Sequence, residues 1–167
     1  MRKIMNLSLI QPEGMGAILL LPVPLKTLIF LFSLKISVGG NSGIKYFLLP
    51  NTSLGCEYQV IDDNKHPDAK LGINGNRKTG ALYDVMPPDL NKHYKPAGEW
   101  NTARIVVKDN HAEHWLNGIK ILDYERGSEA FKQALQKANS IQQKDLQNQL
   151  LRLYCYRHTA TKFRTEI

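Results

Sequence analysis

Three acids, an amide and a histidine lie in or just after a short segment with strand character near the middle of the chain. Glu57 and Gln59 are two residues apart in CEYQVI, and alternate residues of a strand share one face. Asp62, Asp63 and His66 follow directly, at a strand end where loops often carry chemistry. Carboxylates and an imidazole can act as general acids and bases, or bind a divalent cation. The segment is therefore a candidate for acid–base chemistry, with a candidate metal site at Asp62, Asp63 and His66.

Simpler interpretations of the same residues stay open. Glu57 can belong to a solvated strand face, which needs no functional role. Asp62 and Asp63 can cap a loop with their carboxylates, with His66 on the surface. The sequence alone does not choose between the two interpretations.

The elements that must position these residues have the character of β-structure from about residue 35 to residue 122. Short apolar or alternating runs are separated there by Gly, Asn, Pro and Asp. The Asn117–Gly118 pair is typical of a two-residue hairpin turn. Antiparallel strands with such turns predict an all-β sandwich or jelly roll. The expected strands cover residues 44–49, 56–61, 80–85, 102–108, 111–116 and 119–124.

The hydrophobic period changes after residue 127. Ser128 is a favourable helix cap, and apolar residues recur after it at helical spacing. The pattern predicts one short amphipathic helix over residues 128–139.

The charge distribution argues against a nucleic-acid partner. The chain has 167 residues, enough for one domain, and a formal net charge of +7. Residues 35–139 hold 14 basic and 12 acidic residues, so most of the excess lies in the two ends. No basic stripe accompanies the expected strands, and a nucleic-acid interface needs one. The two cysteines, Cys56 and Cys155, are too few for a disulfide framework or a four-thiolate zinc site.

The N-terminal region contains an apolar run over residues 17–34. Pro22, Pro24 and Lys26 interrupt the run. Prolines and a lysine disfavour a regular membrane helix, so we expect no stable membrane span.

Five ordered motifs in the middle of the chain resemble the 3-keto-disaccharide hydrolase family, formerly a domain of unknown function. That resemblance implies a concanavalin A-like β jelly roll, incomplete in this chain, for residues 35–139. The motifs are GGNSGIKYF, GCEYQVIDDNKHPDAK, TGALYDVMPP, KPAGEWNTARIVV and HWLNGIKILDYERGSEAFKQAL.

The resemblance implies a hydrolase that cleaves 3-keto glycosides or disaccharides in carbohydrate catabolism. A partner oxidoreductase would supply the ketone, and the intact family member would be exported or periplasmic. A 3-keto group acidifies the neighbouring C–H bond, so a base can eliminate the leaving sugar before water adds back. The resemblance assigns no cofactor, and a divalent cation is the alternative. A carbohydrate-binding module without turnover is an alternative, because fold does not decide function.

By the same analogy, candidate roles fall on seven residues of the expected jelly roll. For Asn41 and Tyr83, the alternatives are a structural turn residue and a residue that fills the sheet. The catalytic candidates are Glu57, Asp62 and His66, and the substrate-binding candidates are Asn41, Gln59, Tyr83 and Asn101.

The two ends depart from the family pattern. Read one frame away, residues 144–167 and 16–34 can encode strings that resemble the family's closing and opening strands. We therefore expect residues 1–34 to be out of frame or disordered and residues 140–167 to be out of frame. Genuinely divergent ends are the alternative. A frameshifted, non-functional fragment is accordingly a further interpretation of the whole chain.

Overall fold

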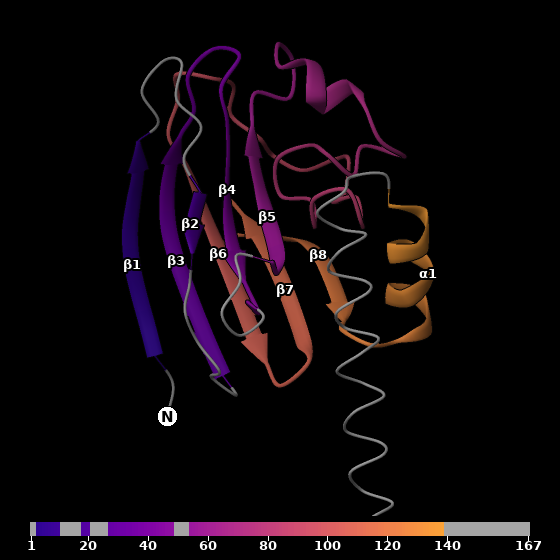
Figure 1. Cartoon of the computed structure of the whole chain (residues 1–167). Coiled ribbons are helices and arrows are strands. Elements are labelled where there is room, and N and C mark those ends of the chain that lie inside the picture. The colour runs from indigo at the N-terminus through magenta and orange to yellow at the C-terminus, as the bar shows by residue number, and fades with distance from the viewer. Residues whose placement is uncertain (1–2, 11–17, 21–26, 49–53, 139–167) are drawn as a thin grey trace, which may run out of the picture.

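The computed structural model describes residues 27–48 and 54–138, together with the backbone of residues 3–10 and 18–20. The described strands form two sheets that face each other (Figure 1). The larger sheet has the order β1-β3-β6-β7-β8, and the smaller has the order β2-β4-β5. Buried residues from both sheets make one hydrophobic core. The predicted all-β class is therefore confirmed.

Strand β3 (Thr27–Lys35) begins upstream of the expected domain boundary at residue 35. Alternate residues of β3 are buried, namely Leu28, Phe30, Phe32 and Leu34. Such alternation is characteristic of a strand with one face on a core. The strand pairs in antiparallel register with β6 (Asn101–Lys108) and in parallel register with β1 (Lys3–Ile10).

Two hairpins complete the larger sheet. Strand β7 (His111–Leu116) pairs with β6 and with β8 (Ile119–Glu125), both antiparallel. Asn117 and Gly118 have φ values of 48° and 84°, as a two-residue turn between β7 and β8 requires. The predicted turn is confirmed, because Asn and Gly adopt this left-handed conformation at low cost.

The smaller sheet carries the expected second strand. Strand β4 (Asn41–Tyr46) pairs antiparallel with β5 (Cys56–Ile61), while the short β2 (Ile18–Leu20) pairs in parallel with β4. The expected strand over residues 80–85 is reduced to isolated bridges at Leu82. Backbone hydrogen bonds nevertheless join this segment to β5, from Gln59 N to Ala81 O and from Tyr83 N to Glu57 O.

The predicted helix is present as α1 (Glu129–Lys137), beside β8 (Figure 1). The Ser128 hydroxyl accepts a hydrogen bond from Phe131 N, so Ser128 is the N-cap. Phe131 stacks on Tyr124 of β8, with ring centroids 5.6 Å apart. The apolar face of the helix thereby closes one side of the core.

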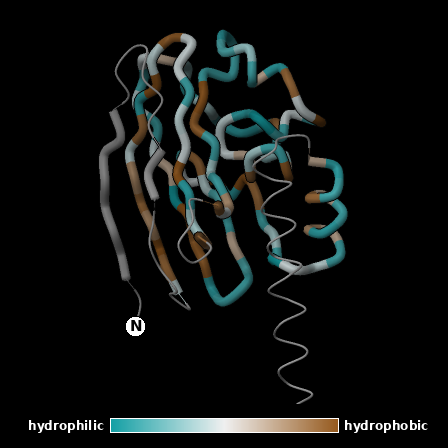
Figure 2. The backbone as a smooth tube through the Cα atoms, viewed as in Figure 1, coloured by the Kyte–Doolittle hydropathy of each residue, from teal (hydrophilic) through white to brown (hydrophobic). Residues whose placement is uncertain are grey.

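Hydrophobic residues recur along the strands of the sandwich, while the loops above them are mostly hydrophilic (Figure 2). One of these loops contains the short 3-10 helix η1 (Pro67–Lys70), which follows β5. In the part of the chain that is described, no helix is long and apolar enough to cross a membrane. The C-terminal segment assigned to residues 140–167 lies outside the described residues, and the frame hypothesis for both ends stays a prediction.

Phe30→Ala tests whether β3 belongs to the core. Phe30 is fully buried and stacks on Phe32, so its removal should cost about 3–5 kcal/mol of unfolding free energy. Denaturant titration followed by circular dichroism measures this loss. Leu31→Ala is the matched control, because Leu31 is 38% exposed on the opposite face and should cost less than about 1 kcal/mol. Equal effects of the two variants would contradict the placement of β3.

Candidate functional site

A buried ion pair lies on the face of the smaller sheet that points away from the core. Lys45 of β4 and Glu57 of β5 are directly opposite in the register. Their neighbours Ile44, Tyr46 and Tyr58 point into the core, so the strand period sends both charged side chains the other way. Lys45 Nζ lies 4.0 Å from Glu57 Oε2, and the two side chains are only 2% and 8% exposed. The solvated-face interpretation of Glu57 therefore does not hold.

Gly43 makes room for the Glu57 carboxyl group. Gly43 is two residues before Lys45 on the same face of β4. A Cβ atom at this position would collide with the carboxyl group, whose Cδ would lie 2.8 Å away. The absence of a side chain at residue 43 is therefore part of the geometry of the ion pair.

The surroundings of Glu57 make its carboxyl group a weaker acid than usual. Burial raises the pKa from 4.5 to about 7 and is the dominant cause. The ammonium group of Lys45 opposes this rise, whereas the negative charge of Asp68 adds to it. Glu57 is therefore close to half ionised at neutral pH, where a carboxyl group can both accept and donate a proton.

Asp68, in η1, connects Glu57 to a second group of charges. Arg77 Nη1 donates to Asp68 Oδ1 at 2.6 Å, and Tyr83 Oη donates to Asp68 Oδ2 at 3.0 Å. Arg77 Nε also donates to Asp84 Oδ1 at 2.8 Å, and the Asp84 side chain is fully buried. These bonds hold the Asp68 carboxylate in one orientation near Glu57.

Two of the predicted substrate-binding residues share the face of Glu57. Gln59 is 1% exposed, and its Nε2 donates to Asn41 Oδ1 at 3.1 Å. Gln59 is paired with Gly43 in the register, one step along the sheet from the Lys45–Glu57 pair. Tyr83 is joined to the same cluster by its hydrogen bond to Asp68 Oδ2. The structure therefore brings Asn41, Gln59 and Tyr83 together with Glu57.

Asp62 closes a turn. Its carboxylate accepts hydrogen bonds from the backbone N–H groups of Gly39, Asn64 and Lys65, at 2.9, 3.0 and 3.2 Å. Burial opposes ionisation, but these three donors outweigh burial and hold the pKa of Asp62 below its usual value. The loop-capping interpretation describes this residue.

Asp63 and His66 are also bonded to separate partners. Asp63 accepts from Thr79 N at 2.7 Å and pairs with Lys92 Nζ at 2.8 Å. His66 Nδ1 accepts from Asp68 N and caps η1. The structure does not bring Asp62, Asp63 and His66 together as a metal-ligand set. Among the described residues, donor atoms close enough to share a metal belong to a different cluster, on β7 and β8.

Asn101 lies apart from the Glu57 cluster, at the start of β6 in the larger sheet. Its side chain bonds to both Lys95 N and Lys95 O, at 2.9 and 3.0 Å, and accepts from Asn117 Nδ2 at 2.8 Å. Asn101 therefore anchors a loop to the β7–β8 turn.

Sequence reasoning missed Lys45, Asp68, Arg77 and Asp84. Lys45 carries a detectable signal, because it is a charged residue between Ile44 and Tyr46 in a strand whose other face is apolar. Asp68 and Arg77 give no such signal, since nine residues separate them and only the folded loop brings them together.

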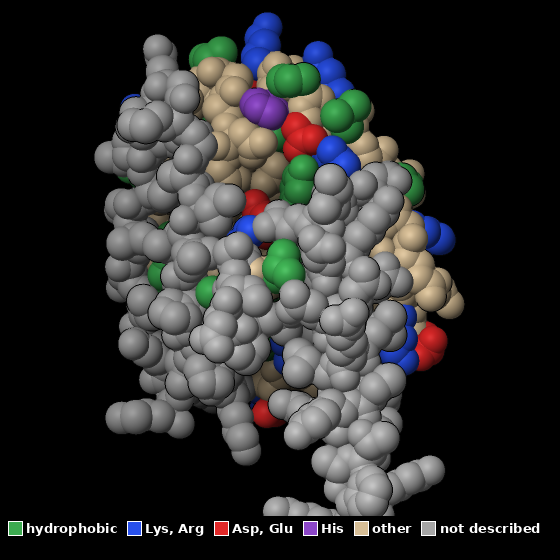
Figure 3. Space-filling view, viewed as in Figure 1, with side chains coloured by type: hydrophobic (Ala, Val, Ile, Leu, Met, Phe, Trp, Pro, Cys, Tyr) green, Lys and Arg blue, Asp and Glu red, His purple; other side chains and the backbone are tan. Residues whose placement is uncertain are grey.

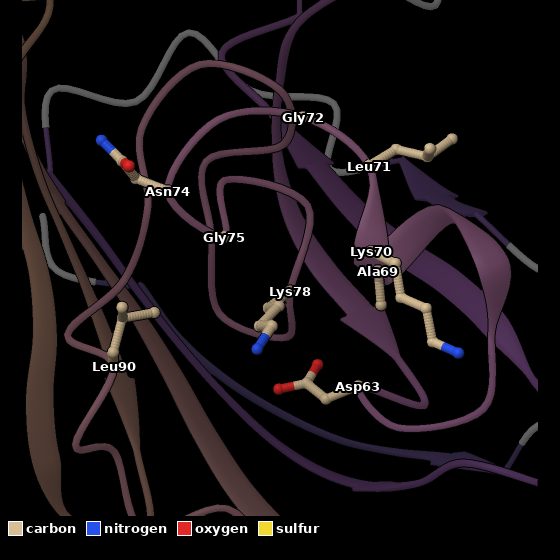
Figure 4. Close-up of a pocket in the computed structure, with 9 residues that line it drawn as sticks. All are labelled: Asp63, Ala69, Lys70, Leu71, Gly72, Asn74, Gly75, Lys78 and Leu90. Atoms are coloured by element: carbon tan, nitrogen blue, oxygen red, sulfur yellow. The ribbon is translucent and has the colours of Figure 1, made fainter.

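A cavity of about 330 Å³ lies beside the loop that contains η1. Ala69 and Lys70 of η1 line this cavity, and Figure 4 shows the Lys78 amine and the Asp63 carboxylate close to each other within it. In the space-filling view, basic, acidic and hydrophobic side chains alternate at the top of the molecule, around these loops (Figure 3). The loop region thus presents a mixed polar and apolar surface, as ligand sites commonly do.

Comparisons with known proteins agree with the resemblance seen in the sequence. Residues 8–165 match the family model of the 3-keto-alpha-glucoside-1,2-lyase-like domain. A 3-keto-disaccharide hydrolase from Bacteroides thetaiotaomicron is 37% identical over 124 residues, covering 66% of this chain and 42% of the relative. The chain thus spans less than half the length of this relative.

A solved structure also resembles the chain. The crystal structure of a "putative glycosyl hydrolase" from Parabacteroides distasonis has a TM-score of 0.58 and 36% identity, covering 66% of this chain and 53% of that one. The predicted family is confirmed: the chain belongs to the family of 3-keto-alpha-glucoside-1,2-lyase-like domains.

Proposed function

We propose that this domain cleaves glycosides that carry a 3-keto group, with Glu57 as the catalytic base. The family supports a function like that of glycoside hydrolases. The assignment of Glu57 as the base is supported by one observation. Its buried carboxyl group has a pKa of about 7 and lies beside the ammonium group of Lys45. A base with a pKa near the working pH is the most effective one for removing a carbon-bound proton.

The reaction begins with proton removal from the carbon between the ketone and the glycosidic carbon. The C2–H bond breaks, the proton passes to a Glu57 oxygen, and the electron pair moves toward the ketone oxygen. The enolate then expels the leaving sugar as the C1–O bond breaks and a C1–C2 double bond forms, and the leaving oxygen takes the proton held by Glu57, which restores the base. Addition of water across this double bond gives the free 3-keto sugar.

Lys45 has two roles in this proposal. Its ammonium group faces Glu57 and limits the rise in the pKa of the carboxyl group. A fixed cation also stabilises negative charge that develops on an enolate. The amide groups of Gln59 and Asn41, on the same face, would bind sugar hydroxyls.

A carbohydrate-binding role without turnover is the second candidate. The observation that favours it is the Asn41–Gln59 amide pair, which suits sugar hydroxyls and requires no chemistry. The chain also covers 42% of its curated relative, so the activity of the whole relative does not transfer directly. An oxidoreductase that makes the 3-keto group, and an exported or periplasmic location, remain part of the proposal for an intact member.

Glu57→Gln tests the catalytic assignment. Glutamine keeps the size of the side chain but cannot accept the proton, so release of sugar from a 3-keto disaccharide should fall by roughly 10²- to 10⁴-fold. Initial rates and KM are measured by chromatography of the products. Glu125→Gln, an exposed change on β8, is the control and should keep full activity.

Two results would argue against the proposal that the domain cleaves 3-keto glycosides with Glu57 as the base. Unchanged turnover in Glu57→Gln would remove this residue from the mechanism. If the unaltered chain binds the 3-keto disaccharide and releases no product, the binding module becomes the better account.

The pH dependence gives a second test. The base must be ionised, so kcat/KM should rise with pH through about 7, where Glu57 loses its proton. Lys45→Met removes the charge that lowers the pKa of Glu57, and the rising limb should move to higher pH. A rising limb near pH 4.5, or one that Lys45→Met leaves in place, would contradict the assignment.

A further inference from the structure

His114 is a fully buried histidine that the proposed mechanism does not use. Alternate residues of β7 are buried, so the His114 side chain points from the larger sheet into the core between the two sheets. Its Nε2 lies 2.6 Å from Tyr46 Oη of β4, and its Nδ1 lies 2.8 Å from Gly80 O. Gly80 belongs to the segment that bonds to β5. One imidazole ring therefore connects the larger sheet to two parts of the smaller one.

The partners of His114 fix which ring nitrogen carries the proton. A carbonyl oxygen only accepts hydrogen bonds, so Nδ1 donates to Gly80 O. Burial lowers the pKa of His114 from 6.5 to about 4, so the ring is neutral at neutral pH and Nε2 accepts from the Tyr46 hydroxyl. Tyr124 Oη, 2.7 Å from Tyr46 Oη, is then the donor of that pair. Both ring nitrogens thus have a partner, which holds His114 in one orientation.

The side chains that His114 contacts directly follow the two charged residues of the candidate site. Tyr46 comes after Lys45 in β4, and Tyr58 comes after Glu57 in β5. The Tyr58 ring lies against the His114 ring, with centroids 4.6 Å apart. Successive residues of a strand point to opposite faces. His114 therefore supports, from the core side, the two strand positions that carry the ion pair on the outer face.

The contact with Gly80 reaches the other edge of β5. Gly80 N donates to Gln59 O at 2.8 Å, while the Gly80 carbonyl accepts from His114. The φ of Gly80 is 85°, and a Cβ atom there would collide with Ile121 Cδ1. Glycine meets both demands of this close approach. The neighbours of β5 on its two edges are thus both bonded to His114.

We propose that His114 is a positioning residue for the candidate active site, because it sets the geometry of the Lys45–Glu57 ion pair from the opposite face of the smaller sheet. The imidazole fixes β4 through Tyr46 and the segment beside β5 through Gly80. Charges in a poorly solvated site interact strongly, so a small change in their separation changes their coupling. The importance of His114 for catalysis rests on the proposed role of Glu57, whereas its effect on the ion pair does not.

A double-mutant cycle, read by carbon-13 NMR of the Glu57 carboxyl group, tests this role. Lys45→Met should raise the pKa of Glu57, because it removes the nearby positive charge. His114→Phe keeps a ring but deletes both hydrogen bonds. In that background the upward shift should shrink to roughly half or less, because the ammonium group is no longer held opposite the carboxyl group. An equal shift in the two backgrounds would overturn the proposal.

Leu116→Ala separates positioning from a general loss of stability. Leu116 is a fully buried residue of the same strand, and its truncation weakens the core without deleting a side-chain hydrogen bond. The full shift caused by Lys45→Met should remain in this background. If the shift shrinks as much as in His114→Phe, His114 has no special role and the proposal fails.

Tyr46→Phe provides a second route if circular dichroism shows that His114→Phe does not fold. It keeps the ring of residue 46 and deletes the hydrogen bond from β4 to His114, so the shift caused by Lys45→Met should again shrink. An undiminished shift in Tyr46→Phe would count against the proposal.

The titration uses no substrate, so its result is independent of turnover. Reduced coupling in His114→Phe, in a chain that releases no sugar, would contradict only the proposed reaction. Undiminished coupling in His114→Phe, in a chain that does release sugar, would contradict only the positioning role of His114.

Discussion

The candidate site depends on one electrostatic constraint, the burial of Glu57 opposite Lys45. A carboxylate taken out of water is costly unless a cation or a proton compensates it. Here Lys45 provides part of the compensation from 4.0 Å, while Asp68 works against ionisation. The balance leaves the pKa of Glu57 at about 7, which suits reversible proton transfer at neutral pH.

The sandwich produces this constraint through strand periodicity. The core takes Ile44, Tyr46 and Tyr58 from β4 and β5, so the residues between them must face outward. Antiparallel register then sets Lys45 against Glu57, and Gly43 leaves the space that the carboxyl group fills. A shift of β5 by one residue against β4 would turn Glu57 toward the core and separate it from Lys45.

Local patterns predicted much of the fold but only part of the candidate site. The segments Cys56–Ile61 and His111–Leu116 have the predicted bounds, because alternation and turn residues are local signals. The shared face of Glu57 and Gln59 follows from the same alternation. Asp62, Asp63 and His66 looked like a functional group because they are close in sequence, yet each bonds to a different partner. Partners such as Arg77 for Asp68 come from loop folding, which no local pattern describes.

The most direct test of the account is a titration of the Glu57 carboxyl group itself. Carbon-13 NMR of side-chain carboxyl groups, with Glu57→Gln used to assign the resonance, reports its protonation at each pH. The account predicts a midpoint near 7, set by burial beside Lys45 and Asp68. A midpoint near 4.5 would mean that the carboxyl group is solvated, and the proposed base would lose its physical foundation.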